Sequence, residues 1–205
     1  MTRPVELAPP FSGRWLVQNS PADRVPSHGT HLFATTYAID FVPVDEVGRS
    51  ARLGLRGLVR PEPPQAFVGF GRPVLAPSDG VVAAVHDGEP DHDAYRGLPS
   101  VGYALTQGRR AHGGWVALAG NHVVVEVRIG VFVALCHLAD GSVGVRPGQE
   151  VAAGEELGRC GNSGNSTEPH LHLQVMDQLD PGRARGLPLT FGNGIPHSGE
   201  IVDAP

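Results

Sequence analysis

The chain has 205 residues, enough for one domain with a substantial core, and it carries a formal net charge of -5. A net negative charge argues against a nucleic-acid partner, and no apolar run is long enough to predict a transmembrane segment. Glycine (28 residues) and proline (19 residues) separate many short β-branched runs, a pattern typical of an all-β domain with many turns.

Both ends of the chain are predicted to be irregular. Residues 1–14 are expected to form an extended arm and residues 196–205 a tail, on a single domain that spans residues 1–205. The first residues, Met1 to Phe11, lack the apolar segment of a signal peptide. A cytoplasmic location is therefore the default expectation, and an extracellular or cell-wall location is the alternative if a signal has been removed. The oligomeric state is left open.

Two strands are predicted in the first part of the chain, over residues 15–19 and 36–43. Alternation in the second strand puts Ile39 and Phe41 on one face and Asp40 on the other. An aspartate within an apolar strand is costly to bury unless it is paired or bound to a metal. Histidines just upstream favour that reading, and a water-facing position at a sheet edge is the alternative.

Long loops and a hairpin are predicted in the middle of the chain. Residues 44–70 and 89–114 have loop character, and loops of this length are uncommon in a compact domain unless they serve a site. The second loop carries four polar residues that are expected to be solvated: Asp91, His92, Asp93 and His112. Between the loops, Pro73 to Val85 contains an Asp-Gly turn and predicts a hairpin.

Two further strands, over residues 121–127 and 131–138, are joined by a turn at Gly130. Alternation predicts that His137 shares a face with Val131, Val133 and Leu135. A core histidine that caps the sheet is the plain alternative to a functional role. The two cysteines, Cys136 and Cys160, are expected to be small buried thiols, with a single bridge between them as the alternative.

The stretch from Gly161 to Val175 runs from a turn-rich segment into a strand that begins at His170. His170 and His172 are predicted to lie on one face of this strand, and the leucines between and after them lie on the other. Such a pair suits one metal ligand and one proton-transfer group, or two ligands. Two half-exposed histidines without a function are the alternative.

Several motifs follow one another in a characteristic order. They are Ala76 to Val82 (Ala-Pro-Ser-Asp-Gly-Val-Val), Leu135 to Leu138 (Leu-Cys-His-Leu), Val145 to Gly158, and the closing segment from Gly161 to Val175 with its His-Leu-His. Together they resemble the lysostaphin/LytM-type zinc metallopeptidases, also called β-lytic endopeptidases. The resemblance spans roughly His31 to Val175.

The resemblance implies one zinc ion per chain and a defined set of site residues. Carried over by motif, it gives two zinc ligands, Asp40 and His172, and two catalytic histidines, His137 and His170. The usual family spacing, His-x-x-x-Asp, is missing, because no histidine lies four residues before the aspartate. The nearer upstream histidine, His31, is therefore predicted to be the third ligand, and His28 is the alternative.

The resemblance also implies a two-layer antiparallel β-sandwich of the lysostaphin-type, duplicated hybrid motif kind, with long loops around a cleft. The implied activity is zinc-dependent hydrolysis of peptide bonds, usually in peptidoglycan cross-links or stem peptides. The alternative is a non-catalytic relative that acts as a regulator or as a cell-wall peptide binding module. A biotinyl or lipoyl carrier of related architecture is excluded, because the chain has no lysine.

Overall fold

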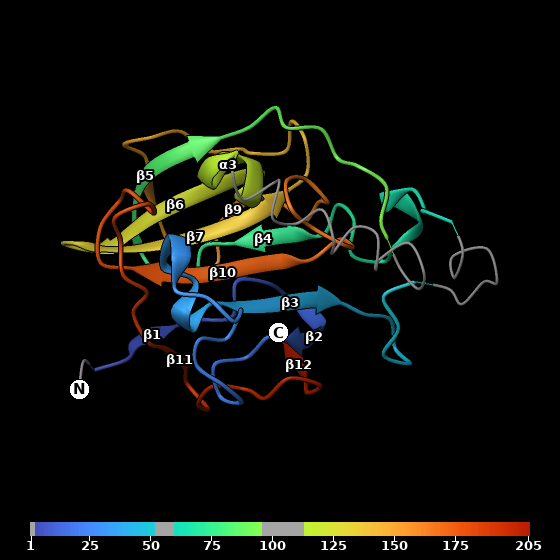
Figure 1. Cartoon of the computed structure of the whole chain (residues 1–205), viewed down its shortest axis with the longest axis horizontal. Coiled ribbons are helices and arrows are strands. Elements are labelled where there is room, and N and C mark those ends of the chain that lie inside the picture. The colour runs from blue at the N-terminus through green and yellow to red at the C-terminus, as the bar shows by residue number, and fades with distance from the viewer. Residues whose placement is uncertain (1–2, 52–59, 96–112) are drawn as a thin grey trace.

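The computed structural model describes residues 3–51, 60–95 and 113–205, and its centre is an eight-stranded antiparallel sheet (Figure 1). Its strands follow the order β12-β2-β3-β10-β7-β6-β5-β8, so β3 and β10 are neighbours in the middle. The strands are β2 (Gly13–Gln18), β3 (Ile39–Pro43), β5 (Gly80–His86), β6 (Asn121–Arg128), β7 (Val131–Leu138), β8 (Glu150–Val151), β10 (Leu171–Met176) and β12 (Ile201–Ala204).

Two small sheets and short helical segments accompany the large sheet. The small sheets are an antiparallel pair, β4 (Pro73–Leu75) with β9 (Glu156–Arg159), and a parallel pair, β1 (Val5–Leu7) with β11 (Leu189–Phe191). The helical segments are η1 (Leu32–Tyr37), η2 (Pro64–Ala66) and α3 (Gly114–Ala119). Within the described ranges, no helix has the length and apolar character needed to cross a bilayer. The predicted all-β class is confirmed, with the β1–β11 pair as the parallel exception.

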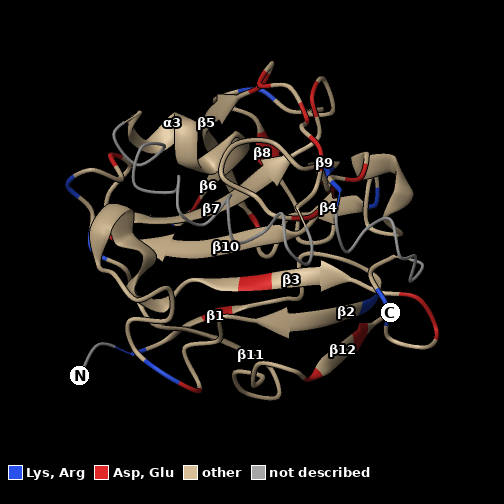
Figure 2. Cartoon of the chain, turned by 45° about the vertical axis from the view of Figure 1, so that its right-hand side comes forward, with Lys and Arg blue, Asp and Glu red and all other residues tan. Residues whose placement is uncertain are grey.

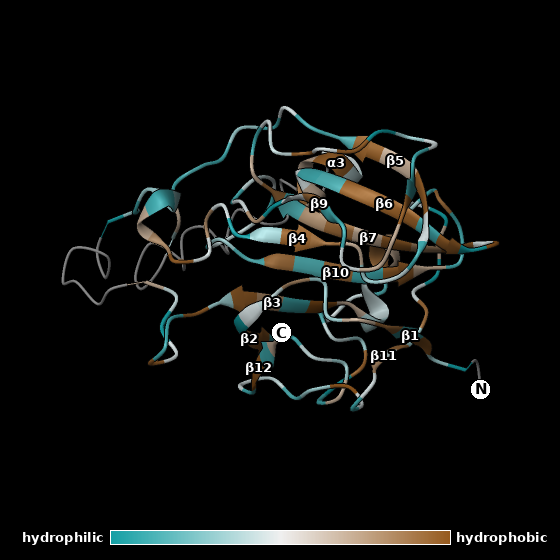
Figure 3. Ribbon diagram, turned by 180° about the vertical axis from the view of Figure 1, so that it is seen from behind, coloured by the Kyte–Doolittle hydropathy of each residue, from teal (hydrophilic) through white to brown (hydrophobic). Residues whose placement is uncertain are grey.

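The large sheet has a different environment on each face. Hydropathy changes from residue to residue along β3 and β10 (Figure 3). The main core lies on one face, where Leu135 and Leu173 belong to the same cluster as Val74 of β4 and Leu157 of β9. The β4–β9 pair therefore forms a second, much smaller layer. A smaller apolar cluster involving η1 and α3 lies on the other face: Ala34, Ala119, Val124, Ala134, Cys136 and Met176.

Both ends of the chain contain strands, where the sequence predicts an arm and a tail. The arm includes β1, whose Val5 and Leu7 are part of the main core. The predicted tail, residues 196–205, includes β12, which pairs with β2 at the edge of the large sheet. These strands are stabilised by pairing with partners that are distant in the sequence. Predictions from local strand propensity do not include this stabilisation.

Two strand predictions need correction. The hairpin predicted over Pro73 to Val85 is wrong, because β4 pairs with β9 whereas β5 pairs with β6 and β8. The Asp-Gly turn instead carries the chain from one sheet to another. The strand predicted from residue 36 begins only at Ile39, because η1 extends to Tyr37. The predicted hairpin of β6 and β7 is confirmed, with Gly130 in the left-handed region at its turn.

The loop residues Asp91 and His92 are held by hydrogen bonds, although the sequence predicts that they are solvated. The Asp91 carboxylate accepts a hydrogen bond of 2.6 Å from the backbone N–H of Asn162. The Asn162 side chain donates to the carbonyl oxygen of His92 at 2.7 Å. Asp93 is exposed, as predicted, and His112 lies outside the described residues. This part of the loop therefore anchors the turn that precedes β10.

The same turn lies very close to the start of β6. Gly120 and Gly164 both have left-handed backbones, with φ of 61° and 70°. A Cβ added to Gly164 would lie 2.4 Å from the backbone nitrogen of Gly120, which is too close for any side chain. Glycine is required here for two reasons, the sign of φ and the backbone contact.

A pair of alanine substitutions can separate these two reasons. Gly130→Ala meets no atom within 4 Å at φ 72°, so it should cost only the left-handed penalty of about 1–2 kcal/mol. Gly164→Ala has nearly the same φ but must also displace the Gly120 backbone, so it should lower the free energy of unfolding further. Urea denaturation of both variants measures the difference. Equal losses would contradict the close packing of the turn.

Candidate metal centre

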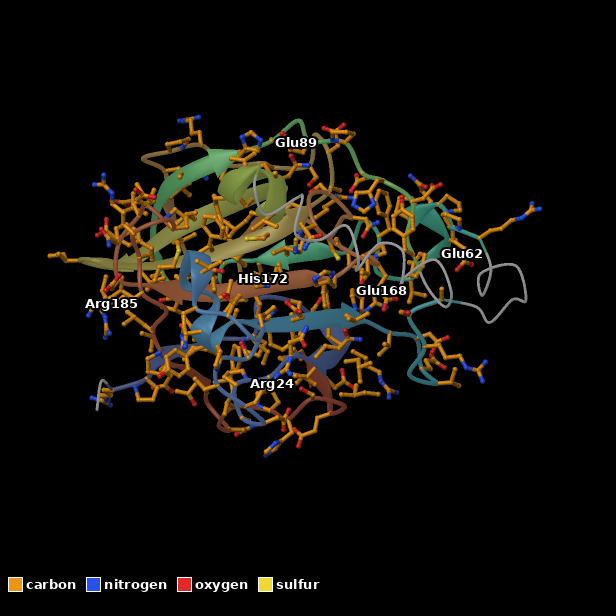
Figure 4. The ribbon with its side chains drawn as sticks, in the orientation of Figure 1. Arg24, Glu62, Glu89, Glu168, His172 and Arg185 are labelled. Carbon is orange, nitrogen blue, oxygen red and sulfur yellow. The ribbon has the colours of Figure 1, made fainter. Side chains whose placement is uncertain are left out.

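Three side chains that can bind a metal converge on the face of the sheet opposite the main core. They are His28, Asp40 and His172, and one ligand atom from each lies within 4.8 Å of the others. Asp40 Oδ2 lies 3.0 Å from His28 Nε2, and Asp40 Oδ1 lies 2.9 Å from His172 Nδ1. Figure 4 shows His172 on β10 near the middle of the molecule. Two imidazoles and a carboxylate form a ligand set that is typical of zinc.

The pairing of β3 with β10 creates this cluster. In the register of the two strands, His172 lies directly opposite Asp40, and Leu173 lies opposite Ile39. The apolar pair points into the main core, so alternation directs Asp40 and His172 to the other face. His28 approaches from the loop before η1 and completes the cluster.

Asp40 is a buried carboxylate that depends on its polar partners. The acidic band in the centre of the sheet in Figure 2 lies in β3. Asp40 is only 5% exposed, and Asn19 Nδ2 donates to its Oδ2 at 2.7 Å. Burial acts to raise the pKa of Asp40, but the charge of His28 and the short polar contacts with His172 and His28 outweigh it, so the pKa lies well below its usual value. The alternative of a water-facing edge position is therefore wrong.

The structure brings His28 into the cluster, whereas the sequence favours His31. His31 is exposed, and its Nδ1 lies 3.0 Å from Thr36 Oγ1 beside η1. It is not a member of the metal-ligating group found among the described residues. Nearness to Asp40 in sequence is a poor guide here, because η1 separates the two residues and His28 reaches the carboxylate from the far side of that turn.

A β-bulge turns His137 toward the same face. The register between β6 and β7 shifts near the end of the pair, and His137 has a left-handed φ of 63°. As a result Leu135 and Leu138 both belong to the main core, while Cys136 and His137 both line the cavity on the other side. The prediction that His137 shares a face with Leu135 is wrong for this reason. Left-handed residues other than glycine cost of order 1–3 kcal/mol and often occur at functional sites.

His170 stands beside His137 and near the carboxylate. The two ring centroids are 4.7 Å apart, and His170 Nε2 lies 3.9 Å from Asp40 Oδ1. His170 immediately precedes β10, which begins at Leu171, one residue later than predicted. Burial, together with the neighbouring charges of His170 and His172, holds the pKa of His137 well below its usual value. The structure therefore brings together four of the five predicted site residues.

Hydrogen bonds on the outer nitrogens determine which nitrogen faces the cluster. His137 Nδ1 lies 2.9 Å from the carbonyl oxygen of Ser163, and His170 Nδ1 lies 2.8 Å from that of Glu168. A carbonyl oxygen can only accept, so both Nδ1 atoms carry hydrogen, and in the neutral ring Nε2 is the nitrogen with the lone pair. His28 follows the same rule, because Ser27 Oγ donates to a backbone carbonyl and is free to accept from His28 Nδ1.

The positions of hydrogen on these rings bear on whether the three donors fit a metal ion. In a neutral His28 ring the Nε2 lone pair would face the ionised Asp40 at 3.0 Å, so the two acceptors require a cation between them. A proton or a metal ion would relieve that conflict. The chemistry of the three donors therefore fits a divalent metal such as zinc.

A cavity of about 660 Å³ opens over the cluster. One wall is apolar and consists of Leu32, Phe33, Trp115 and Leu118. Cys136 also lines the cavity, and both Cys136 and Cys160 are buried and free, as predicted. Burial raises the pKa of both thiols. The cavity is therefore large enough for a peptide segment, and its described lining contributes no reactive thiolate.

Sequence reasoning missed several residues that contribute to the site. Asn19 binds Asp40, Gln174 contacts His172, and Ser163 supplies the carbonyl that holds His137. A signal existed only for Gln174, which lies two residues after His172 and must share its face. The others reach the site through turns whose positions a single sequence does not define.

A comparison with characterised proteins finds a partial relative. A 78-residue stretch is 31% identical to the peptidoglycan DD-endopeptidase ShyA of Vibrio cholerae, covering 38% of this chain and 18% of ShyA. The match thus spans less than a fifth of the relative.

Solved structures give similar but weaker matches. The catalytic domain of the prophage-encoded M23 protein EnpA of Enterococcus faecalis is 18% identical, with a TM-score of 0.43 over 74% of this chain and 73% of that one. The catalytic domain of lysostaphin from Staphylococcus simulans is 20% identical, with a TM-score of 0.41 over 73% of this chain and 74% of that one.

The family model described as Peptidase family M23 matches residues 65–183. Three of the clustered histidines, His137, His170 and His172, lie within that range, whereas His28 and Asp40 precede it. The match covers more than half of the chain and confirms the resemblance seen in the sequence motifs. The protein belongs to Peptidase family M23.

Proposed function

We propose that this protein is a zinc-dependent metalloendopeptidase that hydrolyses peptide bonds in peptidoglycan cross-links or stem peptides. His28, Asp40 and His172 would hold one zinc ion and leave a coordination position open. The observation that carries the proposal is the His28–Asp40–His172 cluster, with Asp40 and His172 buried, beneath a cavity that two further histidines also line. Membership of Peptidase family M23 and the partial match to ShyA support it.

The side chains around the cluster suit hydrolysis without a protein nucleophile. Bound zinc would polarise the scissile carbonyl and acidify water. His137 and His170 each direct Nε2 to the cavity, so the neutral form of one can accept a proton and the protonated form of either can donate to the oxyanion or the leaving amine. Their rings lie 4.7 Å apart, close enough to act on one peptide bond.

The lining of the cavity supports a neutral peptide substrate with small apolar side chains. Among the described lining residues the carboxylates are Asp40 and Glu168, and none is arginine, so away from the histidines the lining offers no cationic side chain to pair with an acidic one. The apolar wall carries Phe33 and Trp115, whose ring centroids are 6.3 Å apart, and the exposed Leu32. We therefore propose that alanine-containing wall peptides are better substrates than all-glycine peptides.

The ligand assignment predicts different zinc contents for two histidine variants. The unchanged protein should bind one zinc ion per chain, and His28→Ala should lose most of it because one of three ligands is gone. His31→Ala serves as the control and should keep it, because His31 stands outside the cluster. Elemental analysis of the purified, dialysed proteins measures both. Zinc loss on changing His31 but not His28 would transfer the ligand role to His31.

The two remaining histidines should affect turnover and not metal content. His137→Ala and His170→Ala are each expected to keep zinc and the folded circular dichroism spectrum, while turnover falls by about a hundredfold or more. The reason is that each supplies proton transfer or oxyanion stabilisation and neither ligates the metal. Full activity in either variant would show that its imidazole has no part in the reaction.

Peptide cleavage tests the function itself and the role of the apolar wall. The zinc-loaded protein should cut alanine-containing muropeptides, detected by mass spectrometry, and a chelator should abolish cleavage. Trp115→Ala should raise KM for these peptides about fourfold, the equivalent of one buried methyl group, and leave glycine peptides unchanged. Val116→Ala, on the same helix but outside the cavity lining, is the matched control.

A negative result on the whole panel would have a clear meaning. If the protein binds zinc and cuts none of these peptides, the peptidase proposal fails, and a regulatory or peptide-binding role takes its place.

A further inference from the structure

Gln174 is a fully buried polar residue in contact with the metal-binding cluster. It lies on β10, two residues after His172, so alternation places both side chains on the same face. Its Oε1 lies 3.0 Å from His172 Nε2, and its Nε2 lies 2.8 Å from the carbonyl oxygen of Phe33. Both ends of the amide are therefore satisfied without water.

The contact with Phe33 decides which way the amide points. The Phe33 carbonyl can only accept a hydrogen bond, so the NH₂ group of Gln174 must face it and the amide oxygen must face His172. That oxygen can only accept, so His172 Nε2 must carry hydrogen. His172 Nδ1 then offers its lone pair toward Asp40, whose Oδ1 lies 2.9 Å away.

The Phe33 carbonyl is itself held in an unusual direction. Phe33 and Ala34 are both left-handed, with φ of 53° and 64°, which turns the backbone sharply inside η1. Gly186 lies against this turn, and a Cβ added there would come within 2.5 Å of the Ala34 carbonyl oxygen. The acceptor that orients Gln174 is thus fixed by tightly packed backbone.

We propose that Gln174 is a positioning residue that fixes the ring orientation and tautomer of His172, so that Nδ1 is the nitrogen available to a metal ion. The proposal rests on the metal-binding role of His172 in the proposed function. Partners of this kind hold the outer nitrogen of a ligating histidine, and their loss typically weakens metal binding 10- to 100-fold.

Two variants at Gln174 test the proposal through zinc affinity, measured by competition with a chromophoric chelator and without any substrate. Gln174→Met has a similar shape but no acceptor, so zinc affinity should fall about 10- to 100-fold. Gln174→Glu retains an oxygen that can accept from His172 Nε2–H, so it should restore most of that affinity. In the zinc-loaded protein, nitrogen NMR should show hydrogen on His172 Nε2.

Val175→Ala is the matched control for a general loss of packing. Val175 is the next residue on β10 and is buried in the main core on the opposite face, so its truncation should lower stability and leave zinc affinity unchanged. The proposal is overturned if Gln174→Met binds zinc as tightly as the unchanged protein, or if Val175→Ala weakens zinc binding equally. A protein that binds zinc with the expected pattern yet cuts no peptide would overturn the peptidase function and leave the role of Gln174 intact.

Discussion

The register between β3 and β10 is the constraint on which the site depends. It sets Asp40 opposite His172 on one face while Ile39 and Leu173 meet on the other. A slip of one residue would send the carboxylate into the main core and an isoleucine into the cavity. The apolar alternation that stabilises the core therefore also fixes the geometry of the ligands. The same few residues of β3 and β10 therefore determine both the packing of the core and the arrangement of the site.

The turn before β10 orients His137 and His170, the two cavity histidines outside the His28–Asp40–His172 cluster. Its Ser163 and Glu168 carbonyls hold His137 and His170 through their Nδ1 atoms, and the Asp91 carboxylate holds its backbone from outside. Backbone carbonyls cannot change between donor and acceptor, so these contacts set the tautomers permanently. The tight packing of the turn against β6 thus helps to fix the carbonyl groups that orient His137 and His170.

The sequence predicts the parts of the site that follow from local alternation. The faces on which Asp40 and His172 lie are predicted correctly, because each residue is inside a regular strand with apolar neighbours. The predicted face of His137 is wrong, because a bulge adds one residue to β7. Nothing in the apolar sequence of that strand indicates where the bulge occurs. His28 is separated from Asp40 by η1, which contains a left-handed turn at Phe33 and Ala34, residues with no intrinsic preference for it, so local sequence does not predict the path between them. Short edge strands such as β12 escape prediction because their stability comes from distant partners.

The cluster joins two parts of the chain that local structure alone would leave independent. His28 and Asp40 precede the segment that matches the family, and His172 lies near the end of that segment. Asp40 of β3 lies 2.9 Å from His172 Nδ1 of β10 and 3.0 Å from His28 Nε2, so the three side chains already hold these segments together. A metal ion held by all three side chains should strengthen the pairing of β3 with β10 further, because a ligand that binds only the folded state stabilises it. An ion bound at this site would then help to hold His28 and β3 on the rest of the fold.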